Sequence, residues 1–249
     1  MARLRKIHVQ QTIVFNRRGG KRKGAGRPAQ HSRSSERHKT RAAIHPNEPI
    51  HVTLRLERDI KTLRKLDMYQ ACRRALARVL GRDTFRIAHI SLQDGHLHTL
   101  VEADNERALA KGMQAFEISA ARYINQALSK LRGTQRRGRV FSDRYHARAI
   151  TTPLAARHAL AYVINNWRRH GKDGDIDLMF SDVDPFSSGA SFMGWKERDA
   201  RVYSGELLDD EPPLPVSVPQ TWLLARGWMQ YGPISVHEVP GPKAQRLVA

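Results

Sequence analysis

Cysteine is almost absent from this 249-residue chain, and acidic residues are scarce beside basic ones. Because a disulfide needs two cysteines, the single Cys72 excludes a fold that depends on internal disulfides. No eighteen apolar residues follow one another, which excludes an ordinary transmembrane helix. The first fifteen residues are basic, but they contain neither a long apolar stretch nor a small-residue cleavage site. We therefore expect a cytoplasmic protein without a membrane partner.

Positive charge is what the chain has in excess. Lys and Arg number 43 against 24 Asp and Glu, which gives a formal net charge of +19. Such an imbalance indicates a polyanionic partner, and nucleic acid is the most frequent one. Residues 1–48 are especially basic, and the Gly, Ser and Pro among them leave no amphipathic period. We expect a disordered arm that binds DNA phosphates without reading bases. The arm residues assigned to this role are Arg17, Arg18, Lys21, Arg22, Lys23 and Arg27.

Alternating and helical patterns of apolar residues divide the next part of the chain into seven elements. In order, they are a strand at 50–57, a helix at 68–82, strands at 85–93 and 96–104, a helix at 105–131, a strand at 139–150 and a helix at 153–170. Asp67 and Thr152 are the expected N-caps of the first and third helices. Asp94-Gly95 is typical of a tight hairpin turn. A basic segment before the last strand supplies four more expected DNA contacts, Arg136, Arg137, Arg139 and Arg144.

The order of these elements predicts the fold. Its first six elements follow the βαββαβ pattern of an α+β, ferredoxin-like fold, with an antiparallel sheet and helices on one face. The helix at 153–170 is then an addition to that core. We expect three parts: the arm at 1–48, one domain at 49–171, and an irregular, proline-containing appendage at 172–249 that packs on the core.

Two histidines, His96 and His98, lie two residues apart in the strand predicted at 96–104. Alternate residues of a strand point to the same face, about 7 Å apart along it. Two imidazoles placed in this way can share one divalent cation, because neutral imidazole is a common metal ligand. A half-exposed strand that happens to contain two histidines is the alternative, so the pair alone does not decide between them.

The helix at 153–170 carries a second candidate group. At about 100° per residue, Leu160, Val163, Ile164 and Trp167 share an apolar face, which is expected to pack on the sheet. Tyr162 and Asn166 are one turn apart on another stripe and are free to project into a site. A surface tyrosine with a polar neighbour is the alternative interpretation.

Taken together, these motifs resemble those of a known family. His96-Leu97-His98 matches the histidine-hydrophobic-histidine signature of HUH nucleases, and Tyr162 to Asn166 follows in the order found in single-tyrosine insertion-sequence transposases. Within that family, the chain is most similar to the REP-associated tyrosine transposases, because residues 138–145 resemble their Gly-x-hydrophobic-Phe-x-x-Arg-Tyr strand. Many relatives have proline where Trp167 stands, so here the helix is expected to continue past Asn166.

The resemblance implies a metal-dependent endonuclease and strand transferase that acts on single-stranded or hairpin DNA, as a monomer or homodimer. It implies that His96, His98 and Asn166 bind Mg²⁺ or Mn²⁺. Tyr162 would attack phosphorus and leave a 5′-phosphotyrosine and a free 3′-OH. A phenol ionises only near pH 10, and the sequence leaves open whether the metal or a basic neighbour assists the attack.

Three alternatives remain at this point. Tyr123 also follows the histidine pair on a helix, although Ala127 stands where a polar partner would be needed. Residues 51–54 and 89–92 each fit the histidine-hydrophobic-Ser/Thr-hydrophobic motif of metal-free two-histidine RNA phosphoesterases, which a chelator would not inhibit. A domesticated DNA-binding protein could keep the fold without cutting DNA.

Overall fold

The computed structural model describes residues 43–175, 178, 181–197, 208 and 211–241. All of them belong to a compact unit that spans His38–Ala249. The six arm residues expected to bind DNA lie outside the described residues, namely Arg17, Arg18, Lys21, Arg22, Lys23 and Arg27. Among the described residues, no helix is both long enough and apolar enough to span a membrane.

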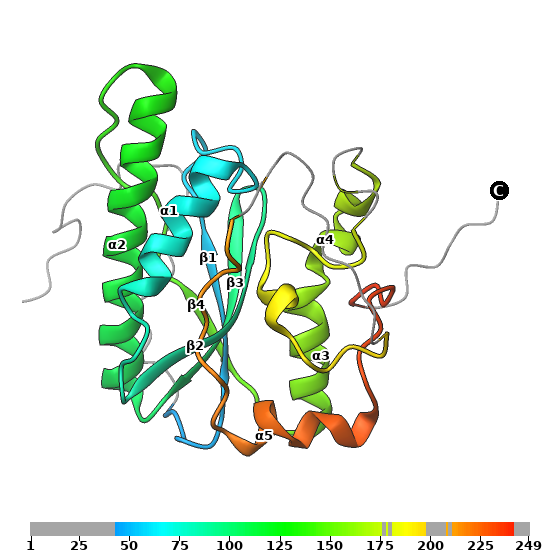
Figure 1. Cartoon of the computed structure of the whole chain (residues 1–249). Coiled ribbons are helices and arrows are strands. Elements are labelled where there is room, and N and C mark those ends of the chain that lie inside the picture. Colours follow the sequence, from blue (N-terminus) through cyan, green and yellow to red (C-terminus); the bar gives the residue numbers. More distant parts are fainter. Residues whose placement is uncertain (1–42, 176–177, 179–180, 198–207, 209–210, 242–249) are drawn as a thin grey trace, which may run out of the picture. The chain divides into compact units, whose positions relative to one another are not determined.

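A four-stranded antiparallel sheet lies at the centre of the described unit (Figure 1). Its strands are β1 (Ile50–Arg55), β2 (Phe85–Leu92), β3 (His96–Ala103) and β4 (His146–Ala149), in the order β2-β3-β1-β4. The first and third strands therefore occupy the middle, as the ferredoxin-like order requires, and the predicted fold is confirmed. The hairpin turn is also where it was predicted. The Gln93 amide donates to the His96 carbonyl at 3.0 Å, and Gly95 has a φ of 73°, which glycine adopts without strain.

Two helices cover one face of the sheet, α1 (Leu66–Ala77) and α2 (Glu106–Arg132) (Figure 1). Apolar residues at helical spacing on α2 face this sheet, and Leu109, Met113, Phe116, Ala120 and Ile124 are fully buried, while Leu128 of the same stripe is partly buried. Asn105 caps this helix by accepting a hydrogen bond from the Ala108 amide. The expected cap of α1 is wrong by two residues. Lys65 is the N-cap, and Asp67 lies in the first turn, where its carboxylate favours the positive end of the helix dipole.

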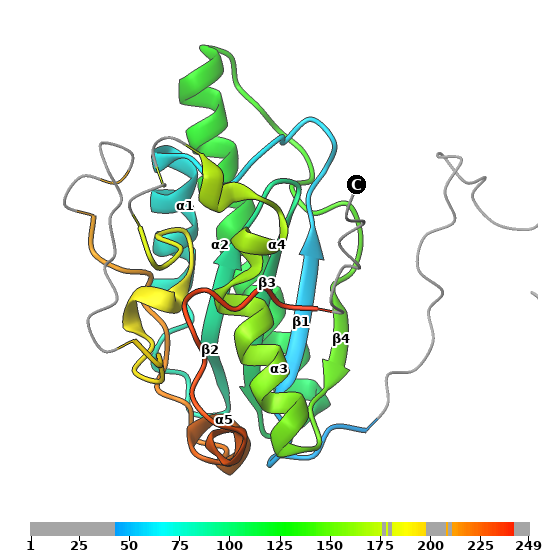
Figure 2. The ribbon, with the colours of Figure 1, turned by 90° about the vertical axis from the view of Figure 1, so that its right-hand side faces the viewer.

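A third helix, α3 (Pro153–Ile164), lies on the opposite face and packs against β2 and β3 (Figure 2). Thr152 caps it as predicted, by accepting from the Ala155 amide at 3.2 Å. The expectation of one helix to residue 170 is wrong, because α3 stops at Ile164 and a short helix α4 (Asn166–Arg169) follows. Asn165 between them leaves helical geometry, with φ −109° and ψ 15°. Its side chain donates to the carbonyls of Ser235 (2.9 Å) and Glu238 (3.1 Å), so contacts with a distant segment accompany the break.

The strand predicted at 139–150 is shorter in the structure. Within this segment, only β4 pairs continuously with β1, while Phe141 makes one isolated bridge to Leu56. Gly138 has a φ of 109°, and the Ser142 amide donates to the Arg55 carbonyl at 2.9 Å. The segment between α2 and β4 therefore follows the end of β1 in an irregular path.

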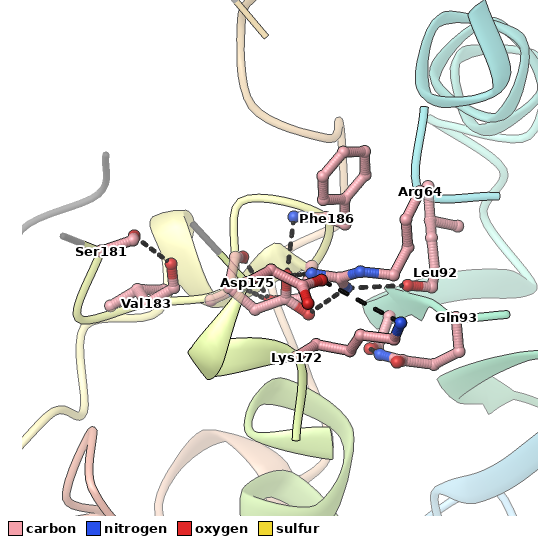
Figure 3. Close-up of polar contacts among 12 residues, drawn as sticks. Arg64, Leu92, Gln93, Lys172, Asp175, Ser181, Val183 and Phe186 are labelled. Atoms are coloured by element: carbon pink, nitrogen blue, oxygen red, sulfur yellow. Dashed lines mark hydrogen bonds and ion pairs between the residues drawn. The ribbon is translucent and has the colours of Figure 1, made fainter. Parts of the chain in front are cut away.

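The described residues beyond Gly171 pack on both sides of this core. The elements they form are η1 (Lys172–Gly174), η2 (Ser188–Ser191), α5 (Trp222–Ala225) and η4 (Gly227–Tyr231). Phe186 and Leu214 join the hydrophobic cluster under α1 and α2, whereas Phe192, Leu224 and Trp228 join the cluster under α3. In addition, Arg64 lies between Leu92 and Phe186 (Figure 3), donates to the Leu92 carbonyl at 3.2 Å, and forms a buried ion pair with Asp184.

Candidate active site

The two histidines of β3 occupy the face of the sheet on which α3 lies. Leu97 and Val101 belong to the cluster under α1 and α2, whereas Leu100 belongs to the cluster under α3. Because side chains alternate along a strand, His96 and His98 share the face of Leu100. Their ring centroids are 4.8 Å apart.

Hydrogen bonds from neighbouring groups determine which nitrogen of each ring is available. His96 Nδ1 lies 3.1 Å from the Asp94 carbonyl oxygen, which can only accept, so Nδ1 carries the hydrogen and Nε2 keeps its lone pair. His98 Nδ1 lies 3.1 Å from Thr53 Oγ1 and 3.2 Å from His51 Nε2. His98 Nε2 is buried and has no hydrogen-bond partner within the described residues. Both rings thus direct their polar contacts through Nδ1, which is how metal-bound histidines are commonly oriented.

Burial keeps these imidazoles neutral. Burial, together with the neighbouring His51, His96 and His170, lowers the pKa of His98 to about 2. The pKa of His51 falls to about 4, mainly through burial and also through the positive charge of Arg148. The pKa of His96 is also lowered, chiefly by burial. All three rings therefore keep lone pairs for a cation near neutral pH.

Tyr162 projects from α3 toward the histidines of the same chain. Its ring centroid is 5.1 Å from that of His98 and 5.6 Å from that of His51, both in edge-on geometry. Tyr123, the alternative nucleophile, lies on α2 against the hydrophobic cluster of the opposite face. The Arg74 guanidinium covers its ring at 4.2 Å from the centroid. Of the two tyrosines, only Tyr162 is therefore beside the histidine pair.

Asn166 is the first residue of α4 and is fully buried. Neither its amide oxygen nor its amide nitrogen has a hydrogen-bond partner within the described residues. An unpaired buried polar group costs about 1–3 kcal/mol, so this amide fits a residue whose partner is a ligand. The neighbouring Asn165 differs, because its amide nitrogen donates to two carbonyls.

The donor set is small for a metal site. Within the described part of the chain, no three His, Cys, Asp or Glu side chains are placed to hold one ion. Two imidazoles and one neutral amide would therefore leave several coordination positions of Mg²⁺ or Mn²⁺ open. Such ions commonly take their remaining ligands from water and from substrate phosphates. Within the described residues, His98 Nε2 and the Asn166 amide are each buried without a hydrogen-bond partner, as an open metal ligand would be.

The four basic residues predicted between α2 and β4 differ in their exposure. The Arg136 guanidinium contacts both carboxylate oxygens of Asp59 at 2.9 Å, the Arg139 carbonyl and the Asn125 side chain. Arg136 therefore stabilises the fold and is not proposed as a DNA contact. Arg137, Arg139 and Arg144 are exposed.

Three further residues border the site but were not identified from the sequence as part of it. Thr53 and His51 contact His98, and the ring centroid of His170 lies 5.6 Å from that of His96. The alternation of β1 indicates that His51 and Thr53 share a face, but only the pairing of Thr53 with His98 brings them here. His89, the second histidine of the phosphoesterase motif, contacts Ser188 and Phe192 instead.

Known proteins provide an independent comparison. Residues 46–166 match the family model described as "Transposase IS200 like". A search of curated proteins finds no match. A solved structure of a REP-associated tyrosine transposase bound to a REP hairpin is 17% identical in sequence, with a TM-score of 0.49, and the match covers 74% of this chain and 99% of that chain. The matched region of this protein, which contains the whole sheet and Tyr162, belongs to the IS200-like family of DNA transposases.

Proposed function

We propose that this protein is a metal-dependent, single-stranded DNA endonuclease and strand transferase in which Tyr162 is the nucleophile. The observation that carries the proposal is the position of the Tyr162 ring, 5.1 Å from that of His98 within one chain. Membership of the transposase family supports the reaction class. The unpaired Asn166 amide supports the assignment of a third ligand.

The proposed cation ligands are His96, His98 and Asn166. A bound Mg²⁺ or Mn²⁺ would polarise the scissile phosphate and offset the negative charge that develops on it. The chain itself holds the two rings in place, through the Asp94 carbonyl for His96 and the Thr53 hydroxyl for His98. A cation held by these residues would give a phosphate a defined position beside the tyrosine ring.

In the proposed step, Tyr162 Oη forms a bond to phosphorus while the bond from phosphorus to the 3′-oxygen breaks. The phenol loses its proton, and the leaving oxygen gains one to become a free 3′-OH. The product is a 5′-phosphotyrosine. Attack on it by a 3′-OH reverses the step, so strands can be rejoined without ATP.

The proposed substrate is single-stranded or hairpin DNA. The net charge of +19 supports a DNA partner. Arg137, Arg139 and Arg144 remain proposed phosphate contacts, together with the basic residues of the arm, namely Arg17, Arg18, Lys21, Arg22, Lys23 and Arg27. Membership of the transposase family is the only basis for proposing a hairpin rather than any other single-stranded DNA.

Covalent capture tests the proposal directly. Wild-type protein with Mn²⁺ and a labelled library of hairpin DNAs should give a denaturation-resistant protein–DNA adduct. Tyr162→Phe should abolish the adduct, and the control Tyr123→Phe should retain it. EDTA should also abolish it, whereas a metal-free phosphoesterase would remain active.

Two outcomes would overturn the proposal. If neither wild type nor Tyr162→Phe gave an adduct with any DNA of a broad library, a non-catalytic DNA-binding role would replace the enzyme. If the adduct persisted in Tyr162→Phe and vanished in Tyr123→Phe, the assignment of the nucleophile would be wrong.

A further inference from the structure

The sheet face that carries the histidines is only partly covered by helix. On this face α3 packs against β2 and β3, and Figure 2 shows β1 and β4 beside it rather than behind it. The opposite side chains of β1, such as Val52 and Leu54, are completely buried under α1 and α2. On the α3 side, by contrast, Arg55 and Arg148 are exposed. We call the part of this face over β1 and β4 the open half of the sheet.

Strand pairing places the exposed side chains of the open half next to the candidate active site. Arg55 pairs with His96, and Thr53 pairs with both His98 and His146. Arg148 pairs with His51. Because directly paired residues point to the same face, Arg55, His146 and Arg148 all share the face of the two histidines. Arg148 lies opposite His51, which is four residues before Arg55 along β1. Along the strand direction, the two arginines are therefore about 13 Å apart, at roughly 3.3 Å per residue.

No carboxylate in the described part of the chain pairs with the two arginines of the open half. Within the described residues, neither the Arg55 nor the Arg148 side chain forms an ion pair. Glu102 shares this face, but it is buried and accepts hydrogen bonds from Gln220 and Thr221. Glu57 lies two residues beyond Arg55, past the end of β1. Unpaired cations grouped beside a nucleophile are complementary to a polyanion.

Tyr162 marks the border of the open half. Its ring contacts His51 of β1 as well as His98 of β3. Tyr162 therefore lies at the boundary between the strands that α3 covers and the strands of the open half. A second copy of this chain, also with a charge of +19, would be repelled from the same surface. A single DNA strand fits, because it brings phosphates to both arginines and can present one of them to the tyrosine.

We propose that the open half of the sheet is the track for one DNA strand, whose phosphates contact Arg55, His146 and Arg148 next to Tyr162. The inference rests on the proposed function and adds the path of the substrate. It assigns binding to three residues that lie outside the basic arm and outside the segment between α2 and β4.

Salt-dependent binding tests the track without any cleavage. In a Tyr162→Phe background, the affinity for a single-stranded oligonucleotide of about 20 nucleotides, longer than typical site sizes, is measured at several salt concentrations. The slope of log K against log salt is negative, and each lost phosphate contact should reduce its magnitude by about 0.7. Arg55→Ala/Arg148→Ala should therefore lose about 1.4 in slope and at least about tenfold in affinity. Arg55→Lys/Arg148→Lys should restore most of both.

The matched control removes two charges from the other side of the sheet. Arg107 and Arg122 are exposed on α2, and Arg107→Ala/Arg122→Ala should leave the slope nearly unchanged. Equal urea midpoints would show that both double variants are folded. If the two double variants lose the same slope, the effect is net charge alone and the track is wrong.

Two further readouts separate this inference from the proposed function. If wild type forms the adduct while Arg55→Ala/Arg148→Ala binds the oligonucleotide like the control, the proposed function is supported and the track is wrong. If no adduct forms but only Arg55→Ala/Arg148→Ala loses salt dependence, the track is supported as a DNA-binding surface without the proposed enzyme activity. A loss of self-association with unchanged DNA binding would instead identify the open half as a contact between copies and overturn the track.

Discussion

At the scale of single residues, the candidate site depends on contacts that engage Nδ1 of each histidine and leave Nε2 without a hydrogen bond to any described residue. Thr53 Oγ1 and His51 Nε2 both lie within 3.2 Å of His98 Nδ1, and a hydroxyl there can accept the Nδ1 hydrogen. Groups that orient a metal-binding imidazole in this way commonly contribute 10–100-fold to metal affinity. Thr53 is thus a positioning residue of the proposed site.

Replacing Thr53 tests that role. Thr53→Val keeps the shape of the side chain but removes the hydroxyl, and we expect Mn²⁺ affinity to fall by about tenfold, near the lower end of that range because His51 remains. Thr53→Ser keeps the hydroxyl and should bind like wild type. Titration calorimetry with Mn²⁺ measures both, and equal affinities of Val and Ser variants would contradict the prediction.

At the scale of elements, the junction between α3 and α4 is the part of the site that the rest of the chain shapes most. The segment 232–241 crosses this junction and accepts hydrogen bonds from Arg157, Asn165, Arg168 and Arg169. Arg157 also forms an ion pair with Glu238 at 2.8 Å. The break separates Tyr162 on α3 from Asn166 on α4, so this segment helps to set their relative positions.

Two neighbouring asparagines at the junction should respond differently to the same truncation. Asn165→Ala loses two hydrogen bonds, and Asn166→Ala loses none, although both leave a similar cavity. Asn165→Ala should therefore reduce the free energy of unfolding by about 1–3 kcal/mol more than Asn166→Ala. Urea unfolding in EDTA measures this difference.

The effect of the two substitutions on metal binding should be the reverse of their effect on stability. Asn166→Ala should abolish tight Mn²⁺ binding while the protein stays folded, because it removes a proposed ligand and no internal bond. Unfolding of Asn166→Ala at lower urea than Asn165→Ala would show that the buried amide is structural.

The contact between α2 and β2 gives a second prediction at this scale. A Cβ added at Gly112 would lie 2.1 Å from the Phe85 ring, which is itself buried. Alanine forms helix better than glycine by about 1 kcal/mol, but overpacking a core costs about 1–3 kcal/mol. Gly112→Ala should therefore lower the free energy of unfolding, whereas Gln114→Ala on the exposed face of α2 should not. A stability gain in Gly112→Ala would show that the ring moves freely.

At the scale of the whole molecule, several imidazoles are buried as neutral groups. Burial lowers the pKa of His89 to about 4, and it does the same for His51. In the unfolded chain these groups titrate near 6.5. Below that pH the unfolded chain binds protons that the folded one does not. Their contribution to stability is therefore complete above about pH 6.5 and is lost as pH falls toward 4.

Acid unfolding measures this linkage. Between about pH 6.5 and 4, stability should fall by up to about 1.4 kcal/mol per pH unit for each such histidine. His89→Asn removes one of these histidines, which lies outside the candidate site. It should reduce the slope of unfolding free energy against pH by up to the equivalent of one bound proton. Urea unfolding in EDTA at several pH values provides the test, with the exposed His158→Asn as control. An identical slope for His89→Asn and wild type would contradict it.

The sequence alone identified most elements, their order and the two residue pairs of the candidate site. These features depend on local periods, such as the alternation that places His96 and His98 on one face and the helical spacing of the α2 stripe. The sequence also favoured Tyr162 over Tyr123, because of its polar neighbour one turn later. The roles assigned to Tyr162, His96, His98 and Asn166 remain proposals.

Only the tertiary structure decided which distant residues meet at the site. Thr53 reaches His98 through the register of β1 with β3, and Arg148 reaches His51 through the register of β4 with β1. At the end of α3, Asn165 donates to a segment some seventy residues later in the chain. No local pattern encodes such pairings, since they arise from the energy of packing remote segments together. That is why the pair of histidines could be predicted, while the residues that orient them and the break beside Tyr162 could not.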